Sequence, residues 1–335
     1  MPALAHPRSG PVQSLLDPAI LFFVFGAAAG FVRSNLEIPP QISRFLSLYL
    51  MMALGLKGGF ALAESGFTAD VSKSLGVALL LAVVVPLAGY ALLRRLVGGF
   101  DAAAVAATYG SVSAVTFITA THYMESRGYG FGAHMPAALA LMESPAIIMA
   151  VLFANILRRE NSTGRAAGSS VPIGKVLHES FTDGAQLLLL GAMLIGLTTG
   201  TSGKAMMEPF TADLFKGLLS FFLLDMGLMA ARSVGELRGK SPWLLAYGVG
   251  APLVHAALAL ALCLLLGVPQ GDAALLMVLA ASASYIAVPA VLRFAIPEAN
   301  PGLYFGLSLG VTFPLNIVFG IPVYVAIAQA AIPGG

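Results

Sequence analysis

Charged residues are scarce in this chain. Asp, Glu, Lys and Arg together make up 10% of its 335 residues, whereas hydrophobic residues make up 58% and the mean hydropathy is +0.88. An ordinary globular protein carries about 25% charged residues, so this chain lacks the charge to cover a water-facing surface. The deficit excludes a soluble domain and indicates a membrane protein.

Other absences narrow the function. The single cysteine, Cys263, excludes an intrachain disulfide, and no Cys/His spacing is typical of a metal cluster. Phosphate-binding glycine-rich loops and nucleophile elbows are also missing. The formal charge of +2 comes without a long basic run of the kind that binds nucleic acid. The sequence therefore argues against an enzyme and a nucleic-acid-binding protein, and it predicts no cofactor.

The chain has long apolar runs instead. A helix needs about 20 mainly apolar residues to cross a bilayer, and ten runs approach that length: 17–33, 40–62, 74–96, 102–121, 136–157, 182–199, 210–231, 242–267, 272–292 and 302–330. They are apolar on consecutive positions, whereas the strands of a membrane β-barrel alternate. We predict an all-α polytopic membrane protein with ten transmembrane helices. The first run has an alternative interpretation as a cleaved signal peptide.

The basic residues predict an orientation in the cell inner (plasma) membrane. With ten spans, twelve Lys and Arg residues fall in the loops after odd-numbered runs and five on the side of the termini. Cytoplasmic loops carry the excess of Lys and Arg. Both termini are therefore predicted to be extracytoplasmic.

The two halves of the chain repeat the same landmarks at an offset of 166 to 172 residues. The aligned features are Gly30 with Gly196, Pro86 with Pro252, 101–113 with 272–284, and Pro145 with Pro314. Five runs, an odd number, make each unit, so the second copy enters the membrane inverted. Inverted repeats with a site near the midplane are typical of secondary transporters. We divide the chain into an extracytoplasmic tail (1–16), a first repeat (17–157), a cytoplasmic linker (158–179) and a second repeat (180–330).

The fourth run of each repeat is predicted to be broken. Ser111 and Ser113, and in the second copy Ser282 and Ser284, lie among small residues midway along apolar runs, and Pro289 can start a second half-helix. Two half-helix N-termini aimed at one point suit a small anion. The alternative is that small residues and Ser only let helices pack closely. Symmetry and matched register favour the binding site.

A series of short motifs, taken in order along the chain, resembles the sodium-dependent bicarbonate permeases first described in cyanobacteria. The resemblance covers about 16–329. The motifs are Ile38-Pro39, 55–59 (GLKGG), 110–116, 142–145 (MESP), 217–220 (GLLS), 235–238 (GELR), 251–255 (APLVH), 281–284 (ASAS) and 296–301 (IPEANP). The resemblance implies ten helices in two inverted units, a gate part and a transport part, a homotrimer, and inward bicarbonate transport driven by sodium. It also implies a PII-like regulatory partner on the cytoplasmic side, although the linker is short beside that of the family.

The candidate substrate-binding residues lie at the two breaks: Gly110, Ser111, Ser113, Thr116, Ser282, Ser284 and Tyr285. Gly110, Ser113, Thr116, Ser282 and Ser284 fit the pattern of the resembled family. The chain departs from that pattern at Val115, Tyr285, Ala287 and Val288, where the resemblance leads us to expect Ser, Asp, Ser and Gly. Losing an acid and two hydroxyls removes oxygen ligands that a hard cation prefers, so fewer coupled sodium ions are expected.

Ionisable residues inside the spans are costly and hence candidates for function. Glu143, beside the broken fourth span, is predicted to bind the cation, the alternative being a neutral, satisfied carboxyl. Thr116 lies nearby, and by the repeat Thr312 and Asn316 offer oxygens in the tenth span. Lys57 and Asp225 are predicted to form a structural ion pair. 

These features support three competing functions. The first is a sodium-coupled bicarbonate importer, and the second is a sodium- or proton-coupled carrier of another small anion such as a monocarboxylate. The third is a sensory membrane module, which needs a soluble output domain that neither terminus carries. The predicted partners are the anion, sodium and membrane lipid.

Overall fold

The computed structural model describes residues 17–66, 68–161, 174, 178, 184–237 and 239–333. The predicted tail 1–16 and most of the predicted linker 158–179 lie outside the described residues. The start of the predicted linker, 158–161, belongs to the last turn of helix α7 (Met135–Asn161).

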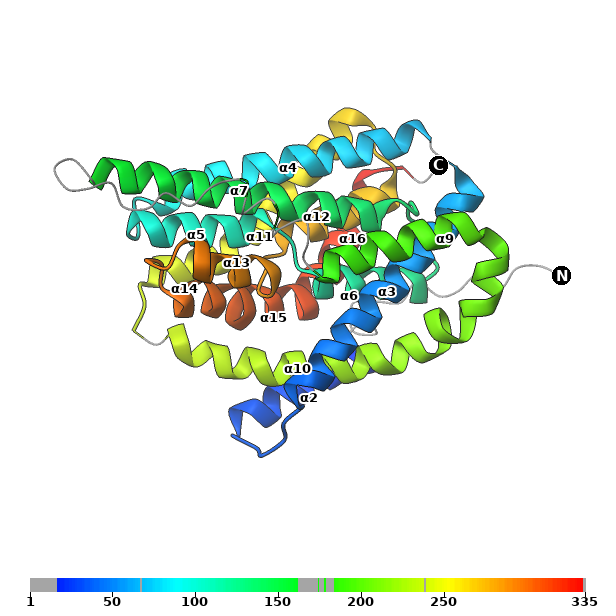
Figure 1. Cartoon of the computed structure of the whole chain (residues 1–335), viewed down its shortest axis with the longest axis horizontal. Helices are drawn as coiled ribbons and strands as arrows, with labels where there is room; N and C mark the ends of the chain where they lie inside the picture. The colour runs from blue at the N-terminus through cyan, green and yellow to red at the C-terminus, as the bar shows by residue number, and fades with distance from the viewer. Residues whose placement is uncertain are drawn as a thin grey trace.

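The described residues form helices, turns and loops, without a strand. In chain order the longer helices are α2 (Pro18–Phe31), α3 (Pro40–Ser65), α4 (Ala69–Leu93), α5 (Gly99–Gly110), α6 (Ala114–Ser126), α7 (Met135–Asn161), α9 (Gly184–Glu208), α10 (Leu214–Val234), α11 (Pro242–Leu266), α12 (Gln270–Ala281) and α13 (Ala287–Ala295). The last helical stretch alternates α and π geometry through α14 (Pro301–Phe305), Gly306–Thr312, α15 (Phe313–Leu315), Asn316–Gly320 and α16 (Ile321–Ala331). Figure 1 shows these helices along one long axis.

Seven helical stretches among the described residues are long and apolar enough to cross a membrane. They are Pro40–Glu64, Ala69–Leu93, Gly99–Ser126, Met135–Arg159, Gly184–Val234, Pro242–Leu266 and Pro301–Ala331, and α2 and α12 are shorter apolar helices. Each of the ten predicted runs falls largely on one of these helical stretches.

The stretch Gly184–Val234 contains two of the predicted runs. Gly200 (φ 55°, ψ −139°) interrupts its helical geometry, and a π turn at Pro209–Asp213 leads into α10. Glycine adopts positive φ without the steric cost that a side chain adds. Helices α9 and α10 therefore run back along the long axis in opposite directions (Figure 1).

Glycines bring two pairs of helices into backbone contact. A Cβ added at Gly30 of α2 would lie 3.1 Å from the Leu228 carbonyl oxygen of α10, and one added at Gly196 of α9 would lie 2.6 Å from the Leu56 carbonyl oxygen of α3. Small residues allow this close approach of membrane helices. The pairs α2–α10 and α3–α9 are thus closely packed.

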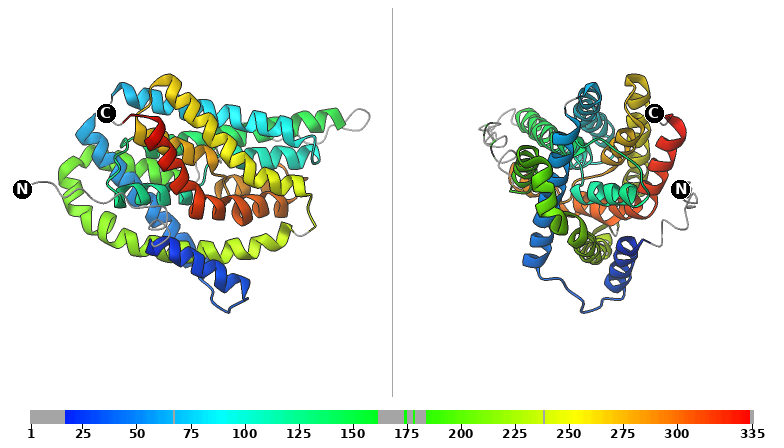
Figure 2. Two further views of the ribbon diagram at one scale, coloured as in Figure 1. Left: turned by 180° about the vertical axis from the view of Figure 1, so that it is seen from behind. Right: turned by 90° about the vertical axis from the view of Figure 1, so that its right-hand side faces the viewer.

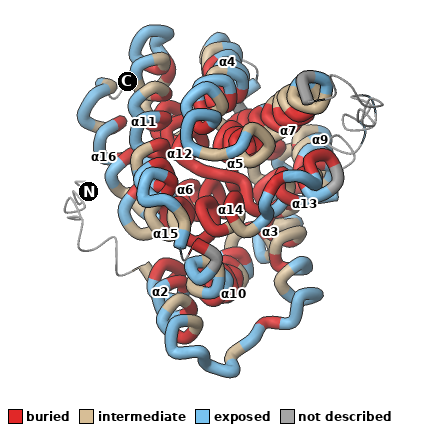
Figure 3. Tube along the Cα trace, turned by 90° about the vertical axis from the view of Figure 1, so that its left-hand side faces the viewer, coloured by how far each residue is buried: buried red, intermediate tan, exposed pale blue. Residues whose placement is uncertain are grey.

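The interrupted helices lie in the interior. In the apolar part of Gly99–Ser126 94% of residues are buried, against 28% in Pro242–Leu266 (α11). Figure 3 shows the same contrast, with α5, α6 and α12 buried and α11 exposed along its outer side. The outer side of α11 carries apolar residues such as Val254 and Leu265, so it suits lipid, whereas the interrupted helices are enclosed by protein.

Candidate transport site

The first break separates α5 from α6. Helix α5 ends at Gly110, and Ser111 to Ser113 are extended before α6 begins at Ala114. The Ser113 side chain caps α6 by accepting a hydrogen bond from the Thr116 N–H at 3.1 Å. Gly110 is needed here because a Cβ would lie 2.5 Å from Pro86 Cβ of α4. The small and hydroxyl residues of the motif thus end one half-helix and start the next.

The second break separates α12 from α13. Residues 282–286 are not helical, and α13 begins at Ala287, two residues before Pro289. The Ser284 hydroxyl accepts a hydrogen bond from the Val288 N–H at 3.3 Å. This break therefore repeats the pattern of the first, with a serine bonding to the start of the following half-helix.

The two breaks cross and satisfy each other's backbone groups. The Ser113 N–H donates to Ser282 Oγ at 2.9 Å, and the Ser284 N–H donates to the Thr108 carbonyl oxygen at 2.8 Å. The Ser282 hydroxyl in turn donates to the Leu279 carbonyl oxygen at 2.7 Å. Unpaired backbone groups in a membrane interior cost several kcal/mol each, so this exchange makes both breaks tolerable.

A cavity of about 60 Å³ lies where the breaks cross. Its lining combines the two breaks, the starts of α6 and α13, and facing residues of α3, α7 and α9: Ser47, Met51, Val112, Ser113, Ala114, Val115, Leu139, Glu143, Ala185, Ser284, Tyr285, Ile286 and Ala287. By the space that one water occupies, the volume holds about four waters. Two helix N-termini thus face one small cavity whose lining is mainly apolar, with a few polar side chains among it.

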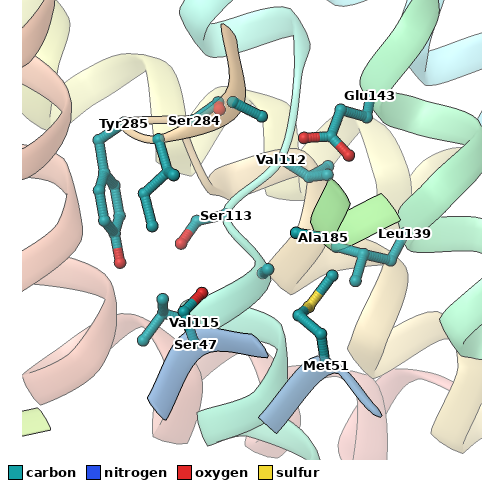
Figure 4. A pocket seen from close by; sticks show the side chains of 13 residues that line it. Ser47, Met51, Val112, Ser113, Val115, Leu139, Glu143, Ala185, Ser284 and Tyr285 are labelled. Atoms are coloured by element: carbon teal, nitrogen blue, oxygen red, sulfur yellow. The ribbon is translucent and has the colours of Figure 1, made fainter. Parts of the chain in front are cut away.

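Glu143 is the acidic side chain in this lining. Figure 4 shows its carboxylate pointing from α7 toward Val112, with Ser113 and Ser284 around the same space. The structure thus brings Glu143, Ser113, Ser284 and Tyr285 together in the lining of one cavity. Their roles as ligands of the anion and the cation stay predictions.

Other predicted substrate residues support the breaks from outside the cavity lining. Thr116 Oγ1 donates to Ser113 Oγ at 2.9 Å. Ser282 Oγ accepts the hydrogen bond from the Ser113 N–H that joins the two breaks. Ser111 is 1% exposed, and its hydroxyl has no hydrogen-bond partner among the described residues. Since Ser113 Oγ accepts from both the N–H and the hydroxyl of Thr116, its own O–H is left to donate.

Thr312 and Asn316 lie outside the cavity lining and bond to backbone carbonyls. Thr312 Oγ1 donates at 2.7 Å to the carbonyl of Gly248, which Pro252 leaves without its helical donor. Thr312 also shares a hydrogen bond of 2.6 Å with the Tyr109 hydroxyl. Asn316 Nδ2 donates at 2.7 Å to the Ala281 carbonyl oxygen at the end of α12. Their role as ion ligands stays a prediction.

The predicted ion pair between Lys57 and Asp225 is corrected by the structure. Lys57 Nζ lies 2.8 and 2.9 Å from the two carboxylate oxygens of Glu125, on α6. Asp225 is 5% exposed, and its Oδ2 has no hydrogen-bond partner among the described residues. The repeat alignment placed Lys57 and Asp225 on equivalent helices, but it carries no information on which side of each helix faces the other.

Sequence reasoning missed the residues that α3 contributes. Ser47 and Met51 line the cavity from α3, and Leu139 lines it from α7. Ser43 and Ser47 are four residues apart in an otherwise apolar helix, a spacing that puts both hydroxyls on one face. That pair of serines was the signal available in the sequence.

The long apolar helices define a multi-pass helical membrane protein, and the cavity lies where its two interrupted helices cross. The family model of the Na+-dependent bicarbonate transporter superfamily matches residues 18–329. The chain belongs to this superfamily. Membership implies a transporter rather than an enzyme, with bicarbonate and sodium as the transported species. No curated protein matches the chain in sequence.

Proposed function

We propose that the protein imports bicarbonate together with sodium by alternating access. The observation that carries this proposal is the crossing of the two breaks, which brings both half-helix N-termini and Glu143 to one cavity. Helix N-termini offer free N–H groups and partial positive charge to the anion. A carboxylate offers oxygen to a hard cation. One cavity thus carries the complementary groups for an anion and a cation.

Reciprocal contacts support two inverted five-helix repeats. Asp101 at the start of α5 accepts a hydrogen bond from the Asn300 N–H at 2.7 Å, and its repeat partner Asp272 at the start of α12 accepts one from the Gly132 N–H at 2.5 Å. Each bond joins one repeat to the loop before the fifth run of the other. The contacts of Gly30 with Leu228 and of Gly196 with Leu56 are related by the same offset.

We infer ten membrane crossings with both termini extracytoplasmic. The reversal between α9 and α10 supports counting two crossings in Gly184–Val234, and the breaks support counting α5–α6 and α12–α13 as one crossing each. The last turns of α7 and α16 lie at opposite ends of the long axis (Figures 1 and 2). That arrangement agrees with the linker and the C-terminus on opposite sides of a plasma membrane.

The proposed coupling is electrostatic. An anion entering a cell with a negative interior moves uphill, at about 2.3 kcal/mol per charge per 100 mV, unless a cation accompanies it. We assign the sodium to Glu143, with Thr116 nearby, and the anion to Ser113 and Ser284. Tyr285 in the lining offers only a phenolic oxygen, so a single coupled sodium is the expected number.

We assign the closely packed pairs α2–α10 and α3–α9 to a gate part. We assign the interrupted helices to a transport part, which moves against the gate part. We extend the proposal to a homotrimer and keep a PII-like cytoplasmic regulator as an expectation of the resemblance. 

Uptake of labelled bicarbonate into liposomes with purified protein tests the function. We expect uptake that an inward sodium gradient stimulates and that an equal potassium gradient does not. Labelled acetate in a parallel arm tests the alternative of a monocarboxylate carrier. Sodium-stimulated acetate uptake without bicarbonate uptake would contradict the proposed substrate.

A further inference from the structure

A second, larger cavity lies along the same face of α3 as the transport cavity. Its volume is about 380 Å³, and its lining comes from α3, α6, the loop before α7, and the turn between α9 and α10: Leu54, Lys57, Gly58, Phe60, Ala61, Glu125, Tyr129, Gly130, Phe131, Ala133, Pro136, Lys204, Glu208, Thr211 and Ala212. We call it the vestibule.

Two helices connect the vestibule to the transport cavity. On α3 the residues Ser47 and Met51 line the inner cavity, and Leu54, Gly58 and Ala61 continue the same face into the vestibule. Ten residues separate Ser47 from Lys57, which is about 15 Å along a helix. Helix α6 begins beside the inner cavity, and Glu125 in its last turn lines the vestibule. The same two helices therefore flank both cavities.

Lys57 is the charged group in the vestibule lining that falls within a predicted span. Its side chain is 29% exposed, and its ammonium group lies 5.0 Å from the Phe215 ring centroid. Both carboxylate oxygens of Glu125 contact the ammonium, at 2.8 and 2.9 Å. A lysine inside a span is costly, and an ion pair with one partner on each of two helices holds it in the vestibule wall.

The Glu125 carboxylate resembles bicarbonate, the proposed substrate, in the groups that an ammonium binds. Bicarbonate and a carboxylate both present two oxygens on one trigonal carbon, and an ammonium group has three N–H donors for them. We propose that Lys57 forms an outer binding site for the transported anion, and that Glu125 occupies this site until the anion replaces it. This inference rests on the proposed function, because it takes the substrate to be a small carboxylate-like anion.

The other charges of the vestibule do not offer the same site. Lys204 pairs with Glu64 at 2.9 Å, and both side chains are about half exposed. Glu208 lines the vestibule as a further acid. Among the described residues the ion pair of Lys57 is with Glu125 and not with Glu208. Glu208 therefore serves as a matched control: Glu208→Gln removes the same charge as Glu125→Gln without releasing the ammonium.

The test is the bicarbonate KM for sodium-driven uptake into liposomes at constant ionic strength. Glu125→Gln should lower KM about twofold to fivefold, the size of a partly exposed ion pair, because it removes the competing carboxylate. Lys57→Gln should raise KM by a similar factor, whereas Lys57→Arg, which keeps the charge, should stay within about twofold of wild type. Glu208→Gln should change KM less than Glu125→Gln does.

A purely structural ion pair predicts a different pattern of KM values. Lys57→Gln and Glu125→Gln break the same ion pair, so both variants would then shift KM in the same direction. Shifts of KM in the same direction in these two variants would overturn the outer site, as would unchanged KM in both. A rise in KM for Lys57→Arg equal to that for Lys57→Gln would overturn it too. Thermal unfolding of each variant in detergent confirms that the kinetics come from folded protein. If the wild type itself takes up no bicarbonate, the proposed function fails, independently of the outer site.

Discussion

The two halves that we propose as repeats are both interrupted by a break, but they differ in chemistry beside it. In the first repeat Glu143 of α7 faces the transport cavity. In the second repeat the equivalent position, by the offset of the repeat, is Thr312, which is fully buried and bonded to the Gly248 carbonyl and the Tyr109 hydroxyl. One position presents a carboxyl group to the cavity, and the other satisfies a carbonyl freed by a proline.

Two repeats with the same fold therefore need not carry the same ion-binding groups at equivalent positions. The anion site that we propose uses both repeats, because Ser113 and Ser284 each line the cavity. The cation site that we propose uses only the first. Variants at repeat-related positions test this asymmetry directly.

The largest effect is expected at Glu143. Glu143→Gln should abolish sodium-stimulated bicarbonate uptake in liposomes, because the amide keeps the shape but loses the charge that a sodium ion needs. Thr312→Val, at the equivalent position, should keep the sodium dependence and lower stability by about 1–3 kcal/mol, because it leaves the Gly248 carbonyl unpaired. If the Glu143→Gln protein keeps the wild-type sodium dependence, Glu143 has a structural role and does not bind the coupled sodium.

The serines of the two breaks should behave alike. Ser113→Ala and Ser284→Ala each remove a hydroxyl from the cavity, and a hydrogen bond to a charged partner is worth about 1.5–3 kcal/mol, or one to two decades of affinity. We expect the apparent bicarbonate affinity to fall by that order in each variant, measured as KM at saturating sodium. If both variants keep the wild-type KM, the anion binds elsewhere.

The glycine crossings test the symmetry of the scaffold. Gly30→Ala and Gly196→Ala each place a methyl group against a carbonyl oxygen of the partner helix, at 3.1 and 2.6 Å. Overpacking of this kind costs about 1–3 kcal/mol, so both proteins should unfold at lower temperature in detergent, by similar amounts because the added methyl of Gly30→Ala also lies 2.7 Å from Ala231 Cβ. A loss in only one of the two would argue against equivalent helix crossings.

The smallest effect is expected at the ion pair between Arg158 and Glu298. The guanidinium of Arg158 lies 2.7 and 2.8 Å from the Glu298 carboxylate oxygens, and its hydrogen bonds lower the pKa of Glu298. A lowered pKa in the folded state stabilises the protein above the pKa of the unfolded state, and this contribution is lost as the pH falls through the folded value. 

Because the Glu298 side chain is 37% exposed, Glu298→Gln should cost under about 1 kcal/mol at neutral pH. The difference in thermal stability between Glu298→Gln and wild type should vanish as the solution becomes acidic. If the difference in thermal stability grew on acidification instead, it would contradict a stabilising ion pair that is lost at low pH.

Much of the scaffold was predictable from sequence because its signals are local. Apolar runs predict helices, and serines among small residues predict the breaks at 111–113 and 282–286. Which side chains face each other is not local. Lys57 contacts Glu125 because α3 and α6 approach in three dimensions, and Thr312 bonds Gly248 because α11 lies beside it. Neither contact has a sequence pattern, so the ion pair with Asp225 was predicted in error.

The asymmetry is tested most directly by measuring sodium and bicarbonate fluxes together. Liposomes with purified protein would receive labelled sodium and labelled bicarbonate in one experiment, and the ratio of protein-dependent uptake would be determined. The account predicts about one sodium per bicarbonate, because Glu143 is the acid in the lining of the cavity. Two or more sodium ions per bicarbonate, or bicarbonate uptake without any sodium, would contradict it.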